Sequence, residues 1–383
     1  MGALHDELRR LGYEGHPLEL LLVRLMFCFF ADDTGIFQKD QFSDWLEIRT
    51  REDGSDLGSS VAEAVDPPWF DAPSRAILLH CARFNGASVS PAIFGSLFQS
   101  VMEARERRSP GAHYTSEKNI LKTIHGLFLD EMSAEFEAAR TKRSERSLKA
   151  LLERIATTRL LDPACGCGNF LILAYRELRR LEIIIHLDLR ALSGDKGLSL
   201  DIGHERGITV DHRPSVPLAS TPGIVQGNAL RLDWKDIVAP SELSYILGNP
   251  PFVGAKMLHD SQRADVENAI GHVSNYGLLD LVAAWYIKAI DYIQGNDIGV
   301  AFVSTNSITQ GEQVGVLWRY LLSRGAHINF AHRTFKWTNE ARGAAAVYCV
   351  IIGFALKTRA AKDIFDYPDI KGEAVIRSAN NIN

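Results

Sequence analysis

Four consecutive residues, Asn249-Pro250-Pro251-Phe252, have the chemistry needed to hold a planar exocyclic amine while its nitrogen is methylated. The two prolines fix φ and remove two N–H donors, so nearby carbonyls remain as acceptors. The Asn249 side chain supplies another acceptor oxygen. An extruded base could donate its amino hydrogens to Asn249 and to the Pro250 carbonyl, while Phe252 stacks on its face, a contact worth roughly 1–3 kcal/mol. The alternative is a Pro-Pro turn with a buried Phe.

A second chemical segment, residues 160–170, has the pattern of a strand, a glycine loop and a helix. Gly166 and Gly168 would let the backbone approach a ligand closely. The helix start that follows would present N–H groups to that ligand. A dinucleotide fingerprint requires a third glycine at position 171, where this chain has Leu171, so NAD is disfavoured. The pattern resembles the first motif of S-adenosylmethionine-dependent methyltransferases, and an ordinary tight turn is the alternative.

Three other segments could complete such a cofactor site. Tyr114 and Thr115 precede a predicted helix, with Thr115 or Ser116 as its N-cap, and polar groups there could bind the cofactor's carboxylate. Asn228 follows a predicted strand and could contact the adenine of the cofactor. Asp280 begins a long predicted helix, where it is either a pocket residue or a partner of the helix dipole. A capped surface helix and a turn Asn beside Gly are the alternatives for the first two.

The elements between residues 106 and 356 must bring these segments together. Strands and helices alternate there, which is typical of a doubly wound α/β sheet. The predicted strands are residues 159–162, 223–226, 245–248, 298–304, 327–331 and 345–354. Ligands of such sheets bind beyond the carboxyl ends of the strands. The glycine loop and the Asn249 loop both follow strands, so we expect them to face each other across one site.

The flanking regions carry no catalytic constellation. Residues 1–105 are helical in pattern, which indicates a helical spacer domain. Residues 357–383 are polar and contain Pro368, so we interpret them as a linker. The most apolar run, residues 18–30, is interrupted by charges and is too short to span a bilayer. We therefore expect no membrane association.

Composition limits the function classes further. The chain has 383 residues, a net charge of −5 and a pI near 6.2, so only local basic patches such as the one at residues 105–108 could favour nucleic acid. Its five cysteines form no C-x-x-C pair, which argues against zinc and for reduced thiols in the cytoplasm. The histidines show no metal-binding spacing, so no metal is predicted.

The order of these motifs resembles that of the γ-class amino-methylating DNA methyltransferases. Longer segments, residues 302–311 and 330–337, are similar to MmeI-type fused restriction–modification enzymes, and residues 3–45 resemble the helical spacer of that family. The resemblance implies a Rossmann-like class I methyltransferase sheet behind a helical spacer. It also implies methylation of the N6 amine of adenine in double-stranded DNA, with S-adenosylmethionine as cofactor, in a restriction–modification or phage-defence system.

Candidate site residues follow from the motifs and the resemblance. The catalytic candidates are Asn249, Pro250, Pro251 and Phe252. The cofactor-binding candidates are Tyr114, Thr115, Asp162, Ala164, Gly166, Gly168, Asn169, Asp211, Asn228, Ala229 and Asp280. The family ends its second strand, before the position of Asn228, in an acidic residue that holds the ribose hydroxyls. Asp211 is the candidate for this role, although the region that contains it is shortened relative to the family.

Other functions stay open at this stage. The family places a nuclease domain before the spacer and a target-recognition domain after the catalytic one, so a separate subunit with either role is a candidate partner. One alternative is a catalytically inactive fragment that acts as a scaffold or partner subunit. Another is a methyltransferase for glutamine side chains or RNA-base amines, because Asn-Pro-Pro-aromatic segments serve those reactions too.

Overall fold

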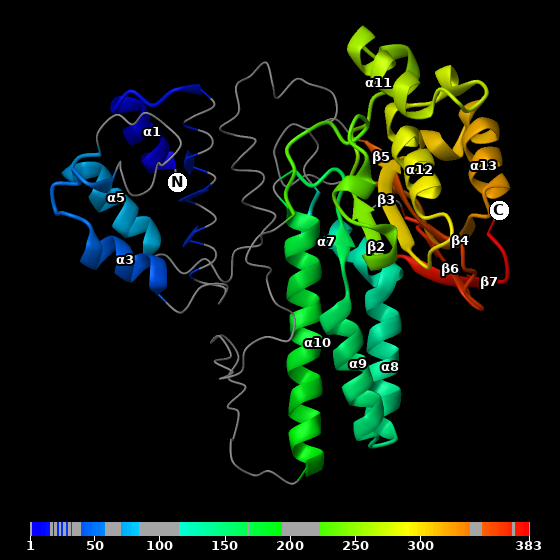
Figure 1. Cartoon of the computed structure of the whole chain (residues 1–383), viewed down its shortest axis with the longest axis horizontal. Helices are drawn as coiled ribbons and strands as arrows, with labels where there is room; N and C mark the ends of the chain where they lie inside the picture. The colour runs from blue at the N-terminus through cyan, green and yellow to red at the C-terminus, as the bar shows by residue number, and fades with distance from the viewer. Residues whose placement is uncertain are drawn as a thin grey trace. The chain divides into compact units, whose positions relative to one another are not determined.

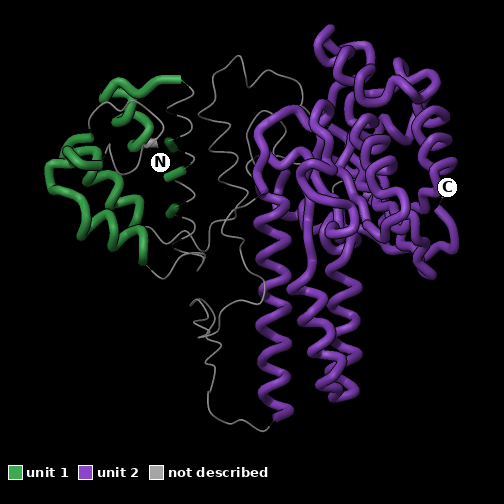
Figure 2. The backbone as a smooth tube through the Cα atoms, in the orientation of Figure 1, with its two compact units in different colours: residues 1–109, 201–211 green, residues 110–200, 212–383 purple. Residues whose placement is uncertain are grey.

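The structure is a computed structural model (Figure 1) that describes residues 2–15, 40–57, 70–83, 115–166, 168–193, 223–337, 347–369 and 372–382, with positions 18, 21, 22, 24, 25, 28, 29 and 32. The chain divides into two compact units. One comprises residues 1–109 and 201–211, and the other comprises residues 110–200 and 212–383 (Figure 2). The boundary predicted at residues 105 and 106 lies outside the described residues.

The first unit is helical. Its described helices are α1 (Gly2–Arg10), α3 (Gln41–Arg49) and α5 (Ala72–Ala82). They bury a separate apolar cluster in which Leu4, Leu46 and Leu78 have no exposed surface. The start of α5 is closed by Asp71, whose carboxylate accepts from the Ser74 N–H at 3.0 Å. The predicted helical character of this region is confirmed in its described part.

The second unit is built on one mixed sheet. Within the described residues its order is β1-β2-β3-β5-β4-β6-β7. The strands are β1 (Leu160–Leu161), β2 (Tyr245–Gly248), β3 (Gly299–Thr305), β4 (His327–Lys336), β5 (Tyr348–Ala355), β6 (Lys362–Asp366) and β7 (Val375–Ala379). The first three are parallel, β5 is antiparallel to both of its neighbours, β6 is parallel to β4, and β7 is antiparallel to β6.

Helices cover both faces of this sheet. They are α7 (Glu117–Ile124), the π-helix η1 (His125–Leu129), α8 (Asp130–Thr141), α9 (Glu145–Thr157), α10 (Asn169–Ser193), α11 (Asp260–Ile270), α12 (Leu281–Tyr292) and α13 (Gln313–Ser323). Short 3-10 helices are η2 (Trp234–Asp236), η3 (Pro240–Glu242), η4 (Ala255–Met257), η5 (Tyr276–Leu278) and η6 (Asn306–Thr309). Figure 1 shows α8, α9 and α10 side by side, extending beyond the sheet.

Alternation along the strands explains the layers. Ile246 and Phe302 belong to the apolar cluster that includes α12 and α13, whereas their neighbours Leu247 and Val303 belong to the cluster that includes α7 and α10. Successive side chains of a strand point to opposite faces, so a run of apolar residues fills two cores. The predicted α/β sheet with helices on both faces is confirmed.

The ring of Phe330 of β4 packs closely between the π-helix and the neighbouring strand β5. A Cβ on Gly126 would lie 2.4 Å from one edge of the Phe330 ring, and a Cβ on Gly353 of β5 would lie 1.9 Å from the other edge. Only glycine permits such close approach at both positions. Arg359 also holds the π-helix by hydrogen bonds. Its guanidinium donates to the backbone carbonyls of Gly126 at 2.7 Å and of Leu127 at 2.5 Å.

Two expectations differ from the structure. Residues 223–226 do not form a strand, and the side chains of Ile224 and Val225 are 76% and 50% exposed. A short apolar run becomes a strand only when a neighbouring strand pairs with it, and no described strand does so. Residues 357–383 were interpreted as a linker, yet they supply β6 and β7. Their polar composition misled because β6 is mostly half-buried and β7 mostly exposed, and such partly covered strands tolerate polar side chains.

Candidate active site

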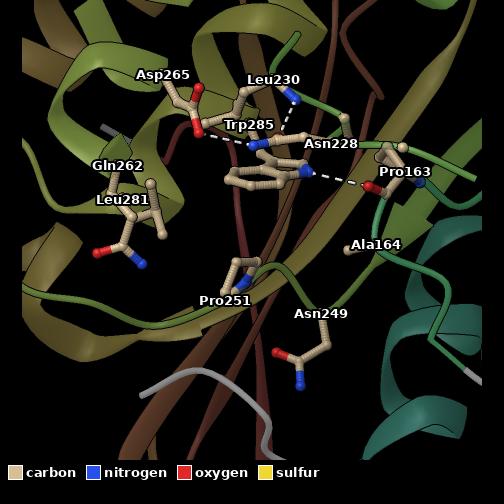
Figure 3. Close-up of a pocket in the computed structure, with 12 residues that line it drawn as sticks. Pro163, Ala164, Asn228, Leu230, Asn249, Pro251, Gln262, Asp265, Leu281 and Trp285 are labelled. Carbon is tan, nitrogen blue, oxygen red and sulfur yellow. Dashed lines mark hydrogen bonds between the residues drawn. The ribbon is translucent and has the colours of Figure 1, made fainter. Parts of the chain in front are cut away.

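The carboxyl ends of β1 and β2 open into one cavity. These strands pair in parallel, with Leu161 opposite Ile246, so the loops after them begin at the same edge of the sheet. A cavity of about 380 Å³ lies there, within the usual range for small-ligand sites (Figure 3). It is lined by Pro163, Ala164, Gly227, Asn228, Ala229, Leu230, Asn249, Pro251, Gln262, Asp265, Leu281 and Trp285. Five of these residues were candidates from the sequence: Ala164, Asn228, Ala229, Asn249 and Pro251.

Asp162 shapes the start of the glycine loop. Its Oδ1 accepts from the Ala164 N–H at 2.9 Å, which turns the chain directly after β1. The carboxyl group also lies against Gly248, where a Cβ would come within 2.6 Å of Oδ1. Glycine at the end of β2 therefore allows the two strand ends to approach each other. Gly166 and Gly168 adopt φ of +53° and +81°, which other residues rarely do, before α10 begins at Asn169.

Burial sets the protonation of Asp162. The residue is 8% exposed, and this desolvation raises the pKa of its carboxyl group to about 7, against the opposing effect of the Ala164 N–H. Its Oδ2 is buried and has no hydrogen-bond partner among the described residues. A buried carboxyl oxygen without a hydrogen-bond partner favours binding of a ligand that is cationic or that donates a hydrogen bond.

The Asn249 loop is joined to the segment that precedes α7. The Asn249 side chain donates from Nδ2 to Oγ1 of Thr115 at 2.9 Å, and Thr115 is 5% exposed. This bond sets which way the Asn249 carboxamide faces. Pro250 is buried, and Phe252 is half-buried. The Phe252 ring meets the ring of Trp337 edge-on, with centroids 6.4 Å apart.

The turn that carries Asn228 forms another polar side of the cavity. Asn228 donates from Nδ2 to Oδ2 of Asp265 at 2.8 Å, and its Oδ1 accepts from the Leu230 N–H at 3.0 Å (Figure 3). Lys288 of α12 donates to the backbone carbonyls of Leu230, at 3.1 Å, and of Leu232. The turn is therefore fixed from α11 on one side and from α12 on the other. Partial burial lowers the pKa of the Lys288 amine.

The structure adds residues that the motifs do not indicate. Gln262 and Asp265 lie three positions apart on α11, and Leu281 and Trp285 lie four apart on α12, so each pair shares a helix face toward the cavity. The Trp285 indole donates to the backbone carbonyl of Pro163 at 3.2 Å. The helical spacing of these pairs is the only sequence signal for them, and many surface helices share it.

The other described candidates are not among the residues that line the cavity. Thr115, Asp162, Gly166, Gly168, Asn169, Pro250 and Phe252 belong to this group. Asp280 also does not line it. The Asp280 carboxylate accepts from the Ala255 N–H at 2.9 Å, from Ser307 Oγ at 2.6 Å and from Gln313 Nε2 at 2.8 Å, and so holds the chain after Phe252. Tyr114 and Asp211 lie outside the described residues.

Two negative findings concern the described residues. They contain no group of three His, Cys, Asp or Glu side chains arranged to hold a metal ion. None of their helices combines the length and apolar character that crossing a membrane requires.

Comparisons with known proteins place the chain in a family. The family model for the MmeI DNA-methyltransferase domain matches residues 136–215 and 204–366, and the model for the MmeI helicase spacer domain matches residues 16–98. DNA methyltransferase A of Bacillus subtilis (strain 168) is 36% identical over an alignment of 413 positions, which covers 91% of this chain and 47% of that protein.

One solved structure agrees with this placement, and a second shows the shared fold alone. The Type IIL restriction–modification enzyme MmeI, solved in complex with DNA, is 44% identical and has a TM-score of 0.80. That match covers 100% of this chain and 60% of MmeI. The type IIG restriction endonuclease BpuSI, at 12% identity and a TM-score of 0.52, shares the fold over 99% of this chain and 44% of its own. This chain thus spans about half to three fifths of the length of its relatives. The resemblance drawn from the sequence is confirmed: the chain belongs to the MmeI family and carries its spacer and DNA-methyltransferase domains.

Proposed function

We propose that this chain supplies the cofactor site and the amine-binding site of an S-adenosylmethionine-dependent DNA methyltransferase that modifies the N6 amine of adenine in a restriction–modification system. One observation carries the proposal. The glycine loop after β1 and the Asn-Pro-Pro loop after β2 both line a single cavity, through Ala164 on one side and Asn249 with Pro251 on the other. A donor and an acceptor of a methyl group need to meet within one enclosed space.

The residues that line the cavity, together with the glycine loop that carries Ala164, fit S-adenosylmethionine. The bound cofactor would supply a methyl group on a cationic sulfonium. A buried carboxyl oxygen without a partner, at Asp162, suits a cationic ligand. The backbone beside Gly166 and Gly168 has open space, because a Cβ on either would meet nothing within 4 Å. Asn228 offers amide groups for a nucleobase edge, and Leu281 and Trp285 offer apolar surface.

The Asn249 loop would hold the base to be methylated. The Asn249 carboxamide oxygen and the Pro250 carbonyl would accept the two hydrogens of the amine, which draws the nitrogen lone pair out of conjugation as it attacks. The bond from Asn249 Nδ2 to Thr115 supports this role, because it fixes the orientation of the carboxamide. Phe252 would stack on the base. Positioning and electrostatics would supply most of the acceleration, without a covalent intermediate.

The proposed substrate is double-stranded DNA, and the DNA complex of MmeI supports this choice. A base inside a duplex is buried in the stack, so it must be extruded at a cost of roughly a few kcal/mol. With a net charge of −5, the chain as a whole does not have the basic character that many DNA-binding proteins show. We also propose that target-recognition and nuclease regions act together with this chain. They would lie either on the same polypeptide or on another subunit.

Replacement of Asn249 tests the function directly. The Asn249→Ala variant should bind S-adenosylmethionine with the affinity of the parent but lose methyl transfer by about 100-fold or more, because it lacks one of the two groups that grip the amine. Calorimetry measures the binding. Transfer of labelled methyl groups to amplified genomic DNA, followed by nucleoside analysis for N6-methyladenine, measures the reaction.

A matched control and the alternatives complete this test. Asn268→Ala removes a similar side chain from the exposed surface of α11 and should leave transfer unchanged. Equal activity of Asn249→Ala and the parent would refute the role of Asn249. A parent that binds no S-adenosylmethionine would favour an inactive scaffold instead. Labelling of RNA or of a glutamine-containing protein, in place of DNA, would identify the other amine substrates.

A further inference from the structure

The carboxamide of Asn228 can face only one way. Its Nδ2 donates to Oδ2 of Asp265 at 2.8 Å, and its Oδ1 accepts from the backbone N–H of Leu230 at 3.0 Å. Rotation by a half turn would place the amide oxygen against the carboxylate and the amide N–H groups against the Leu230 N–H. Both contacts would then be repulsive, because acceptors would face acceptors and donors would face donors.

Asp265 is held rigidly enough to act as this lock. It is 7% exposed and lies on α11. Arg231 donates from Nε to Oδ1 of Asp265 at 2.6 Å and from Nη2 to Oδ2 at 3.3 Å. Both Asn228 and Asp265 line the cavity (Figure 3). Since the turn that carries Asn228 is also tied to Lys288, neither partner can easily move away from the other.

The locked carboxamide retains one N–H and one lone pair that the chain does not use in these two bonds. Because a carboxamide carries its NH₂ group and its oxygen side by side, locking it fixes the order in which it presents donor and acceptor. The six-membered ring edge of adenine presents an amino donor beside a ring-nitrogen acceptor. Hypoxanthine presents a carbonyl acceptor beside an N–H donor, which is the reverse order. A carboxamide that could turn over would serve either base, whereas a locked one serves only one of them.

We propose that Asp265 is a positioning residue that fixes the carboxamide of Asn228 and thereby makes the cavity selective for adenine over hypoxanthine in the nucleoside part of the cofactor. This inference rests on the proposed function, because it takes S-adenosylmethionine as the ligand. It assigns to α11, the first long helix after the Asn249 loop, a role in cofactor selection.

Two stable ligands test the selectivity of the whole chain. S-adenosylhomocysteine carries adenine, and S-inosylhomocysteine carries hypoxanthine on an otherwise identical frame. The parent should bind the adenine form on the order of 10- to 100-fold more tightly, because the hypoxanthine form would set donor against donor and acceptor against acceptor where the base covers Asn228. Calorimetry measures both dissociation constants under one set of conditions.

The Asp265→Asn variant should remove the preference without changing the shape of the site. Arg231 would keep the amide oxygen of the new Asn on its own side, since its Nε must face an acceptor. The new NH₂ group would then face Asn228 and would allow its carboxamide to turn over. The ratio of the two dissociation constants should fall to within about threefold of unity.

Asp265→Ala is a second variant, which removes the carboxylate altogether and should reduce the preference less than Asp265→Asn, because the Leu230 N–H still favours Oδ1 of Asn228. Asp291→Asn is the matched control. Asp291 of α12 also accepts from an arginine, Arg324 at 3.1 Å, but it does not line the cavity, so the preference should persist. A residue with only a structural role would weaken both ligands equally and leave their ratio unchanged.

The outcomes separate this inference from the function on which it rests. A parent that binds S-adenosylhomocysteine without any preference over the inosine form overturns the inference alone. An unchanged ratio in both Asp265 variants does the same. A parent that binds neither ligand overturns the proposed function and the inference with it.

Discussion

Asp162 illustrates how a single buried group combines structural and electrostatic effects. Its carboxyl group turns the glycine loop through the Ala164 N–H and packs against Gly248 of the neighbouring strand. The same burial raises its pKa from an ordinary 3.8 to about 7. The free energy of folding and the geometry of the cavity therefore depend on one titrating side chain.

The pH dependence of stability should reveal this group. Because its pKa is raised in the folded state, Asp162 binds more protons there than in the unfolded chain between about pH 4 and pH 7. Its contribution to the free energy of unfolding is present below 3.8 and is lost as the pH rises through about 7. From about pH 5 to about pH 7 the parent should lose up to about 2 kcal/mol relative to Asp162→Asn, whose side chain does not titrate.

Urea denaturation of the parent and of Asp162→Asn at several pH values measures this difference. The stability gap should stay level above about pH 8, where the carboxyl group is ionised in both states. A gap that is independent of pH throughout this window would show that Asp162 does not titrate as its burial indicates.

At the scale of helices and strands, the packing of one helix on the sheet depends on the ring of Phe330. Its ring lies between Gly126 of the π-helix and Gly353 of β5, so the helical layer and two strands share one contact. Arg359, at the start of the segment that the sequence indicated as a linker, donates to two carbonyls of the same π-helix. That segment is therefore fastened to the helical layer as well as to the sheet edge.

Gly353→Ala should destabilise the second unit by roughly 1–3 kcal/mol or more, because the added methyl group would overlap the Phe330 ring. Gly315→Ala is the matched control in the helix α13. A Cβ there meets nothing within 4 Å, so this change should raise stability by roughly 0.5–1 kcal/mol. The free energies of unfolding in urea compare the two. Similar values for both variants would contradict the close packing of Phe330.

At the scale of the whole chain, the buried apolar residues form separate clusters. The members of one cluster all come from residues 4–82, while the other two clusters use residues of the second unit only. The described residues of the candidate site also belong to the second unit. Cofactor binding should therefore need only this unit, in keeping with domains that have their own cores.

A fragment that starts at Pro110 and ends at Asn383 tests this expectation. It should bind S-adenosylhomocysteine within about threefold of the affinity of the full chain, because the cavity and both sheet cores lie within it. Circular dichroism checks that the fragment folds, and calorimetry measures its binding. A folded fragment with an affinity reduced more than about tenfold would mean that the first unit contributes to the site.

The sequence by itself determined the features that depend on neighbouring residues. Gly166 and Gly168 mark a turn because their own φ values are positive, and β2 is apolar throughout because both of its faces are buried. Local patterns of this kind predicted the α/β fold and the facing of the glycine loop and the Asn249 loop across one site, whereas the family followed from the resemblance of longer segments. The individual catalytic and cofactor roles stay predictions.

Only the tertiary structure decided which distant residues meet. Asn228 and Asp265 are 37 positions apart, and nothing in either neighbourhood signals their bond. Residues 223–226 are apolar enough for a strand but have no described partner, whereas the polar residues of β6 and β7 find partners at the sheet edge. The physical reason is the same in each case. A hydrogen bond between strands or side chains depends on what folding brings beside a residue, and the residue's own type does not reveal it.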